Sequence, residues 1–132
     1  MSAAQPPRHI TIVDDDRDTR ELLEIGLGQR GYHVTVVPNG LRLFAALQID
    51  KPEIVILDVN MSWIDGFELC RGLKRNPAYS SIPVLFLSGR SSPSDIEHGL
   101  ACGAAGYMTK PVHLAELVAK VESIIGATSA AR

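Results

Sequence analysis

Residues 10–16 read Ile-Thr-Ile-Val-Asp-Asp-Asp, a short apolar run that ends abruptly in three carboxylates. β-Branched residues favour strands, and an almost continuously apolar run is typical of a strand covered on both faces of a parallel sheet. Similar runs recur along the chain at 34–37, 54–57 and 84–87 and, more weakly, at 106–109. The sequence therefore predicts a sheet of five parallel strands.

Longer amphipathic stretches separate these runs, and their apolar residues have helical spacing. We expect helices over 18–29, 41–48, 67–75, 94–101 and from His113 onwards, with Ser94 as the cap of the fourth. The residues expected to face the core are Leu22, Leu23 and Leu27 in the first helix; Leu41, Phe44, Ala45 and Gln48 in the second; Phe67, Cys70 and Leu73 in the third; and Leu114, Leu117, Val118, Val121, Ile124 and Ile125 in the last.

Strands that alternate with helices predict right-handed crossovers and an α/β sheet with helices on both faces, although this pattern does not set the strand order. A length of 132 residues suits one domain. We assign residues 1–8 to a flexible N-terminal segment, 9–126 to the domain and 127–132 to a C-terminal tail.

The composition is that of an ordinary globular protein, 45% hydrophobic and 21% charged. A net charge of −2 gives no indication of direct nucleic-acid or membrane binding. Residues 1–8 lack the apolar segment of a secretory signal, and no apolar run approaches the roughly 20 residues that span a bilayer. Cys70 and Cys102 lack metal-like spacing, so we interpret them as reduced packing residues of a cytoplasmic protein.

Polar residues gather where the predicted strands end. Asp14, Asp15 and Asp16 follow the first strand, whereas Asp58, Ser88 and Lys110 end the third, fourth and fifth strands. Because the carboxyl ends of parallel strands meet at one edge of the sheet, these residues are expected to converge on one site.

Several carboxylates at one edge raise one another's pKa values, and a divalent cation removes that conflict. Oxygen ligands of this kind suit magnesium. Aspartate is also a nucleophile toward phosphorus, and phosphoryl transfer needs mainly positioning and neutralisation of oxygen charge. Asp58 with magnesium, Lys110 and Ser88 would therefore suffice for phosphorylation of an aspartate.

At these residues the chain resembles the receiver domain of two-component response regulators, and in particular the chemotaxis receivers. The similarity runs from about His9 to Ile125 and rests on the motifs at 13–16, 56–58, 65–66, 87–89 and 107–111. Each motif is weak alone, but their order and spacing together are specific. The resemblance implies a doubly wound, flavodoxin-like sheet in the order 2-1-3-4-5.

The resemblance also implies a role for each site residue. Asp58 would be the phosphoacceptor. Magnesium, for which manganese can substitute, would be held by Asp15, by Asp14 through water, by Asp58 and by the backbone carbonyl of Asn60. Ser88 and Lys110 would bind phosphoryl oxygens, and Tyr107 would be the switch aromatic. A cis peptide bond before Pro111 would direct Lys110 into the site.

The implied function is a phosphorylation-dependent signalling switch and not an enzyme in its own right, although the domain would assist its own phosphorylation and dephosphorylation. Its partners would be a histidine kinase or phosphotransfer protein and a downstream effector or output domain, with phosphorylation-dependent homodimerisation left open. Trp63, the only tryptophan, is either a partner anchor or a cover over its own domain.

Two alternatives differ in class. One is a constitutive protein-binding module with a receiver fold. Such modules typically lack the acceptor, an acidic residue or the lysine, all of which are present here. The other is a magnesium-dependent phosphatase, which commonly carries an acidic residue two positions after the nucleophile, where this chain has Asn60.

Overall fold

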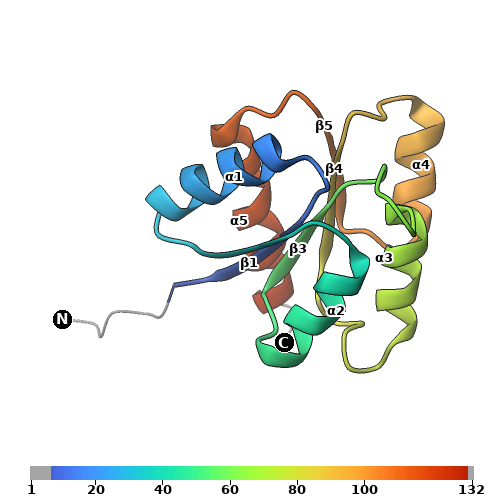
Figure 1. The fold of residues 1–132 in the computed structure, drawn as a ribbon, viewed down its shortest axis with the longest axis horizontal. Helices are drawn as coiled ribbons and strands as arrows, with labels where there is room; N and C mark the ends of the chain where they lie inside the picture. Colours follow the sequence, from blue (N-terminus) through green and yellow to red (C-terminus); the bar gives the residue numbers. More distant parts are fainter. Residues whose placement is uncertain (1–6, 131–132) are drawn as a thin grey trace.

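The computed structural model describes residues 7–130, with side chains through residue 127. Within that range the strands form one parallel sheet in the order β2-β1-β3-β4-β5, which confirms the expected fold (Figure 1). Residues 1–6 of the segment predicted to be flexible, and 131–132 of the predicted tail, lie outside this description. Among the described residues no helix combines the length and apolar character needed to cross a membrane.

The strands alternate with the helices along the chain. The strands are β1 (His9–Val13), β2 (His33–Val37), β3 (Ile54–Leu57), β4 (Val84–Ser88) and β5 (Gly106–Thr109), each within one residue of its predicted limits. The helices are α1 (Arg17–Gln29), α2 (Gly40–Ile49), α3 (Gly66–Arg75), α4 (Pro93–Ala101) and α5 (Leu114–Ala130). The last helix therefore includes residues 127–130, which the sequence analysis assigned to the tail.

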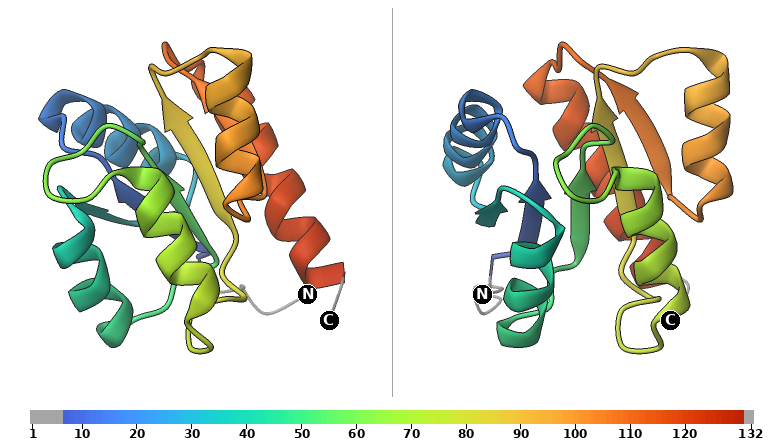
Figure 2. Two further views of the ribbon diagram at one scale, coloured as in Figure 1. Left: turned by 90° about the vertical axis from the view of Figure 1, so that its right-hand side faces the viewer. Right: turned by 45° about the vertical axis from the view of Figure 1, so that its right-hand side comes forward.

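Two apolar clusters, one on each face of the sheet, form the core. α1 and α5 cover one face, and α2, α3 and α4 lie on the other (Figures 1 and 2). The faces of α3 and α5 agree with the prediction. The buried helix residues include Leu43 and Leu47 of α2, Phe67, Cys70 and Leu73 of α3, and Leu117, Val121, Ile124 and Ile125 of α5.

Two helix faces were predicted wrongly. In α1, Leu22 is 61% exposed, while Leu23 and Leu27 are buried as expected. In α2, Leu41 is 82% exposed, Ala45 and Gln48 are also exposed and Phe44 is only half-buried. The buried stripe of α2 is Gly40, Leu43 and Leu47, and Gly40 packs closely on α3, since a Cβ added there would lie 3.3 Å from Leu69.

The start of α4 also differs from the prediction. Ser92, and not Ser94, caps the helix, since its hydroxyl accepts a hydrogen bond from the backbone N–H of Asp95 at 3.0 Å. Pro93 occupies the first helical position, where the absence of a backbone N–H costs nothing. A serine directly before a proline is therefore the local signal that sets this boundary.

Gly66 brings the start of α3 against the end of β3. Its N–H donates to the carbonyl of Val59 at 2.8 Å, and an added Cβ would lie 2.1 Å from the carbonyl oxygen of Asp58. The clash is with backbone, which cannot turn aside as a side chain can. A glycine is therefore required here to position Asp58.

We expect Gly66→Ala to lower the free energy of unfolding by about 3 kcal/mol or more, because it overpacks a backbone contact. Gly72→Ala is the matched control in the same helix, since a Cβ added there would meet no atom within 4 Å. That control should leave stability unchanged or raise it by up to about 1 kcal/mol through helix propensity. Urea titrations of both variants make the comparison, and equal stabilities would contradict the packing account.

Candidate functional site

The carboxyl ends of β1, β3, β4 and β5 bring the predicted site residues together, at the edge where the arrowheads point in Figure 2. Hydrogen bonds of the sheet continue into the residues that follow the strands. The N–H of Asp58 donates to the carbonyl oxygen of Val13 at 3.1 Å, and the N–H of Lys110 donates to the carbonyl oxygen of Ser88 at 2.9 Å. The backbone of each of these residues is thus fixed by a neighbouring strand.

The Lys110 ammonium joins two buried carboxylates. Its Nζ donates to Asp14 Oδ2 at 2.8 Å and to Asp58 Oδ2 at 3.1 Å. Asp14 and Asp58 are 2% and 7% exposed. Charged groups are buried at this level only where they are paired and hydrogen-bonded. The contact therefore links three strand ends that are far apart in the sequence.

Burial and ion pairing shift the pKa values of Asp14 and Lys110 in opposite directions. Burial raises the pKa of Asp14, and the hydrogen bond from Lys110 only partly offsets this. For Lys110, burial lowers the pKa, but the hydrogen bonds to Asp14 and Asp58 together outweigh it, so that the pKa is raised. Lys110 is therefore held in its charged form.

The same edge provides ligands suited to a cation. Carboxylate oxygens of Asp14, Asp15 and Asp58 all lie within 4.8 Å of one another, and Asp15 is exposed to solvent. Three carboxylates face one ammonium, so the cluster retains excess negative charge. A set of oxygen ligands with one side open to water fits magnesium, which usually keeps several waters. Asn60 is exposed next to the cluster, and its N–H donates to Asp58 Oδ1 at 3.3 Å.

Ser88 and Tyr107 are connected through the backbone of Arg90. The hydroxyl of Ser88, which is fully buried, accepts the N–H of Arg90 at 3.2 Å. The hydroxyl of Tyr107 donates to the Arg90 carbonyl at 2.6 Å. Tyr107 also packs tightly on α4, because a Cβ at Gly99 would lie 2.7 Å from its ring. The loop after β4 therefore links the site to α4.

The sequence matches the response regulator receiver domain family over residues 10–122, and the matched segment includes every residue of this edge. The chain belongs to that family.

Named relatives are consistent with this assignment. The transcriptional regulatory protein CseB of Streptomyces coelicolor is 37% identical over 117 residues, which is 89% of this chain and 49% of CseB. The response regulator MprA of Mycobacterium sp. strain KMS is 37% identical over 123 residues, which is 93% of this chain and 53% of MprA. The receiver domain thus spans about half the length of the curated relatives it matches.

Solved structures show the same fold. A receiver domain of a signal transduction histidine kinase from Syntrophus aciditrophicus superposes with a TM-score of 0.83 at 35% identity, covering 91% of both chains. Vibrio cholerae chemotaxis protein CheY4 superposes with a TM-score of 0.84 at 28% identity, covering 89% of this chain and 98% of that one.

Residues around the cluster have structural roles in this receiver domain. Asp16 caps α1 and Asp65 caps α3 through their carboxylates. Arg20, which the sequence analysis did not single out, donates to the carbonyl of Asp14 at 2.8 Å. The peptide bond between Lys110 and Pro111 is cis, as the resemblance implied.

Trp63 does not cover its own domain, because its side chain is 97% exposed. Its φ of 79° lies in the left-handed region, which is uncommon for a bulky residue. The ring borders an apolar hollow of about 470 Å³ with Leu41, Phe44 and Ile64. This exposure contradicts the covering role, and the partner-anchor role stays a prediction.

The cysteines are buried and unpaired. Burial raises the pKa of Cys70 to about 11, so its thiol stays protonated and unreactive at neutral pH. Cys102 is also a free thiol, and the hydrogen bond from Cys70 goes to its carbonyl. Both cysteines therefore act as packing residues, as predicted.

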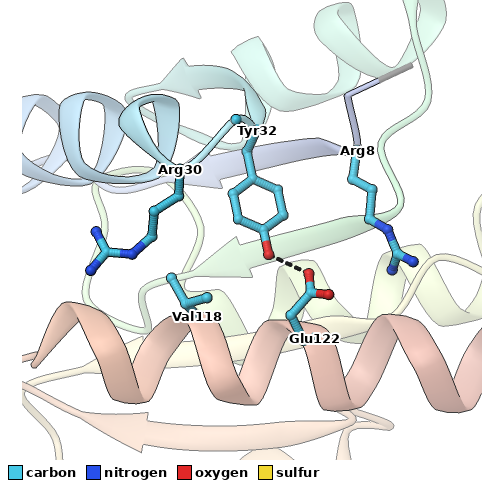
Figure 3. Close-up of a pocket in the computed structure, with 6 residues that line it drawn as sticks. Arg8, Arg30, Tyr32, Val118 and Glu122 are labelled. Carbon is cyan, nitrogen blue, oxygen red and sulfur yellow. Dashed lines mark hydrogen bonds between the residues drawn. The ribbon is translucent and has the colours of Figure 1, made fainter. Parts of the chain in front are cut away.

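A separate hollow lies between α1 and α5, away from the acidic edge (Figure 3). The hydroxyl of Tyr32 donates to Glu122 across it, and burial followed by this bond raises the pKa of Tyr32 to about 12. Figure 3 shows Arg8 and Arg30 on opposite sides of that bond. Their guanidinium groups do not converge, so the hollow does not form an anion site.

Magnesium at ten times its dissociation constant is expected to stabilise the domain by about 1.4 kcal/mol, because it binds only the folded cluster. Thermal unfolding with and without magnesium measures this shift. Asp15→Asn should remove most of it, whereas Asp18→Asn, the matched loss of an exposed carboxylate outside the cluster, should not. A magnesium effect that survives Asp15→Asn would contradict the assigned ligands.

Proposed function

We propose that this receiver domain is a phosphorylation-dependent switch that accepts a phosphoryl group on Asp58. The observation that carries the proposal is the contact of Lys110 with both Asp14 and Asp58, beside the carboxylate of Asp15. It supports the proposal because a carboxylate that could act as nucleophile, a charged lysine and further oxygen atoms suited to magnesium lie together at one end of the strands. Phosphoryl transfer to a carboxylate needs this equipment and little more.

In the transfer, an oxygen of Asp58 forms a bond to phosphorus while the phosphorus–nitrogen bond of a donor phosphohistidine breaks. The electron pair of that bond stays with the donor imidazole. Oδ2 of Asp58 is engaged by Lys110, whereas Oδ1 accepts only a long bond from Asn60. After transfer Lys110 exchanges its bond to Asp58 for one to a phosphoryl oxygen, and the Ser88 hydroxyl binds another.

The carboxylates of Asp14, Asp15 and Asp58 and the carbonyl of Asn60 would hold magnesium, or manganese in its place. The bound ion supplies neutralisation of the phosphoryl oxygen charge. The protein's own contribution is to hold these oxygens on strand ends that the sheet fixes, and to keep Lys110 charged.

Phosphorylation would be transmitted through Ser88 and Arg90 to Tyr107. If the Ser88 hydroxyl turns to a phosphoryl oxygen, the N–H of Arg90 loses its acceptor. The loop that carries the hydrogen bond from Tyr107 then changes, and with it the surface formed by α4 and β5. Phosphorylation thereby biases an equilibrium between two arrangements of this face.

The partners that fit this chemistry are a histidine kinase or phosphotransfer protein as donor and a downstream effector or output domain as receiver of the signal. A cytoplasmic location suits a kinase donor and the two free thiols.

We treat the domain as a phosphoacceptor and not as an enzyme. Because CseB, which is named as a transcriptional regulatory protein, is about twice as long as this chain, DNA binding by a longer protein is compatible with this proposal.

Incubation with magnesium and a small-molecule phosphodonor should add the mass of one phosphoryl group to the intact chain. Asp58→Asn should abolish the gain without unfolding the domain, and chelation of magnesium should prevent it. Asp65→Asn, which keeps a side-chain cap for α3, is the matched control and should still be labelled. Labelling that persists in Asp58→Asn would contradict the assignment, and no labelling of the wild type would favour the constitutive binding module.

Ser88→Ala is expected to uncouple phosphorylation from the surface change. Asp58 should still be labelled, but loss of a hydrogen bond to a charged group, worth about 1.5 kcal/mol, should shift the switching equilibrium roughly tenfold toward the inactive arrangement. Backbone amide shifts of Tyr107 and α4, recorded with and without phosphodonor, measure this. Ser91→Ala is the control at a nearby exposed serine. If the phosphodonor changes these amide chemical shifts in Ser88→Ala as much as in the wild type, the route through Ser88 is contradicted.

A further inference from the structure

A second group of metal-binding residue types lies at the opposite edge of the sheet from Asp58. His9 and His33 open β1 and β2 and are paired in register, and Asp50 directly follows α2. One potential ligand atom from each of the three lies within 4.8 Å of the others. Two imidazoles and one carboxylate are a ligand set that suits zinc and related metals.

The His9 ring supplies the decisive observation. His9 is 8% exposed, and its Nε2 is hydrogen-bonded to Thr35 Oγ1 at 2.8 Å. Its Nδ1 is buried without a hydrogen-bond partner and lies 3.5 Å from Asp50 Oδ2. Buried polar atoms are nearly always hydrogen-bonded, so a buried ring nitrogen that makes no hydrogen bond and faces a carboxylate has its lone pair available for a metal ion.

The bond to Thr35 also sets the ring for metal binding. When Nε2–H donates to a hydroxyl, the neutral tautomer leaves the Nδ1 lone pair free and directed toward Asp50. Histidine ligands in proteins typically donate their other N–H in this way. Neutral imidazole is the form that binds metals.

The spacing leaves room for an ion. His33 Nε2 lies 4.0 Å from Asp50 Oδ2, and the His9 and His33 rings are stacked with centroids 4.4 Å apart. Ligands bonded at about 2.1 Å in a tetrahedral shell stand roughly 3.4 Å apart, so small movements would close the site. His33 and Asp50 are exposed and can make those movements, whereas the buried His9 stays fixed.

We propose that His9, His33 and Asp50 bind a divalent transition metal of the zinc class, with the fourth position open to water. The bound ion would tie the amino ends of β1 and β2 to the connection between α2 and β3. This site is distinct from the acidic edge, because five residues of β1 at about 3.3 Å each put roughly 16 Å between His9 and Asp14.

Isothermal titration of the untagged chain with zinc, in excess magnesium to occupy the acidic edge, tests the proposal. We expect one zinc site in the wild type and at least tenfold weaker binding in His33→Ala and in Asp50→Asn. His113→Ala removes an exposed histidine outside the cluster and should bind zinc as the wild type does. Thr35→Val keeps all three ligands but removes the acceptor of His9 Nε2, and should weaken binding between tenfold and a hundredfold.

Nitrogen NMR of the imidazole rings provides a second readout at His9, which is too buried to replace safely. Zinc should shift the Nδ1 resonance of His9 and the Nε2 resonance of His33, and leave His98 and His113 unchanged. No zinc binding by the wild type would overturn the proposal. Equal affinities in the wild type, His33→Ala and Asp50→Asn would overturn it too, since zinc would then bind elsewhere.

Discussion

The contact of one ammonium with two buried carboxylates is the interaction on which this domain's function depends. Asp14 and Asp58 stand almost fully buried on adjacent strand ends, and each would repel the other without Lys110 between them. Lys110 follows β5, an outermost strand of the sheet. It contacts both carboxylates because β1 and β3, which carry them, are neighbours in the observed strand order. Pairing with Lys110 therefore offsets the free-energy cost of burying these two charges. With Asp15 beside them, the cluster keeps excess negative charge.

The same constraint explains the structure around the site. Gly66 lets α3 begin directly against the backbone carbonyl of Asp58. Arg20 engages the carbonyl of Asp14 from the other side. Ser88 and Tyr107 both form hydrogen bonds with the backbone of Arg90, so one loop connects the buried serine to the strand that packs on α4.

The strands and most of the site were predictable from the sequence because buried parallel strands leave continuous apolar runs, and the residues that follow them converge on one edge. Helix faces were less predictable. In α2, two stripes have helical spacing, and the contact of Gly40 with Leu69 of another helix decides between them. The role of Arg90 could not be predicted either. Its backbone N–H and carbonyl, and not its side chain, connect Ser88 to Tyr107, so the residue type carries no signal. The His9 cluster depends on strand pairing between residues twenty-four positions apart, which no local motif reveals.

We propose that Lys110 exchanges its contact with the Asp58 carboxylate for one with a phosphoryl oxygen when Asp58 is phosphorylated. A crystal structure of the chain with magnesium and beryllofluoride, a stable mimic of the phosphoryl group, tests it most directly. We expect beryllofluoride bonded to an Asp58 oxygen, the Lys110 ammonium in contact with a fluorine, and the Ser88 hydroxyl turned away from the Arg90 N–H. Beryllofluoride bonded elsewhere, or bonded to Asp58 while Lys110 still contacts Oδ2 of that residue, would contradict the claim.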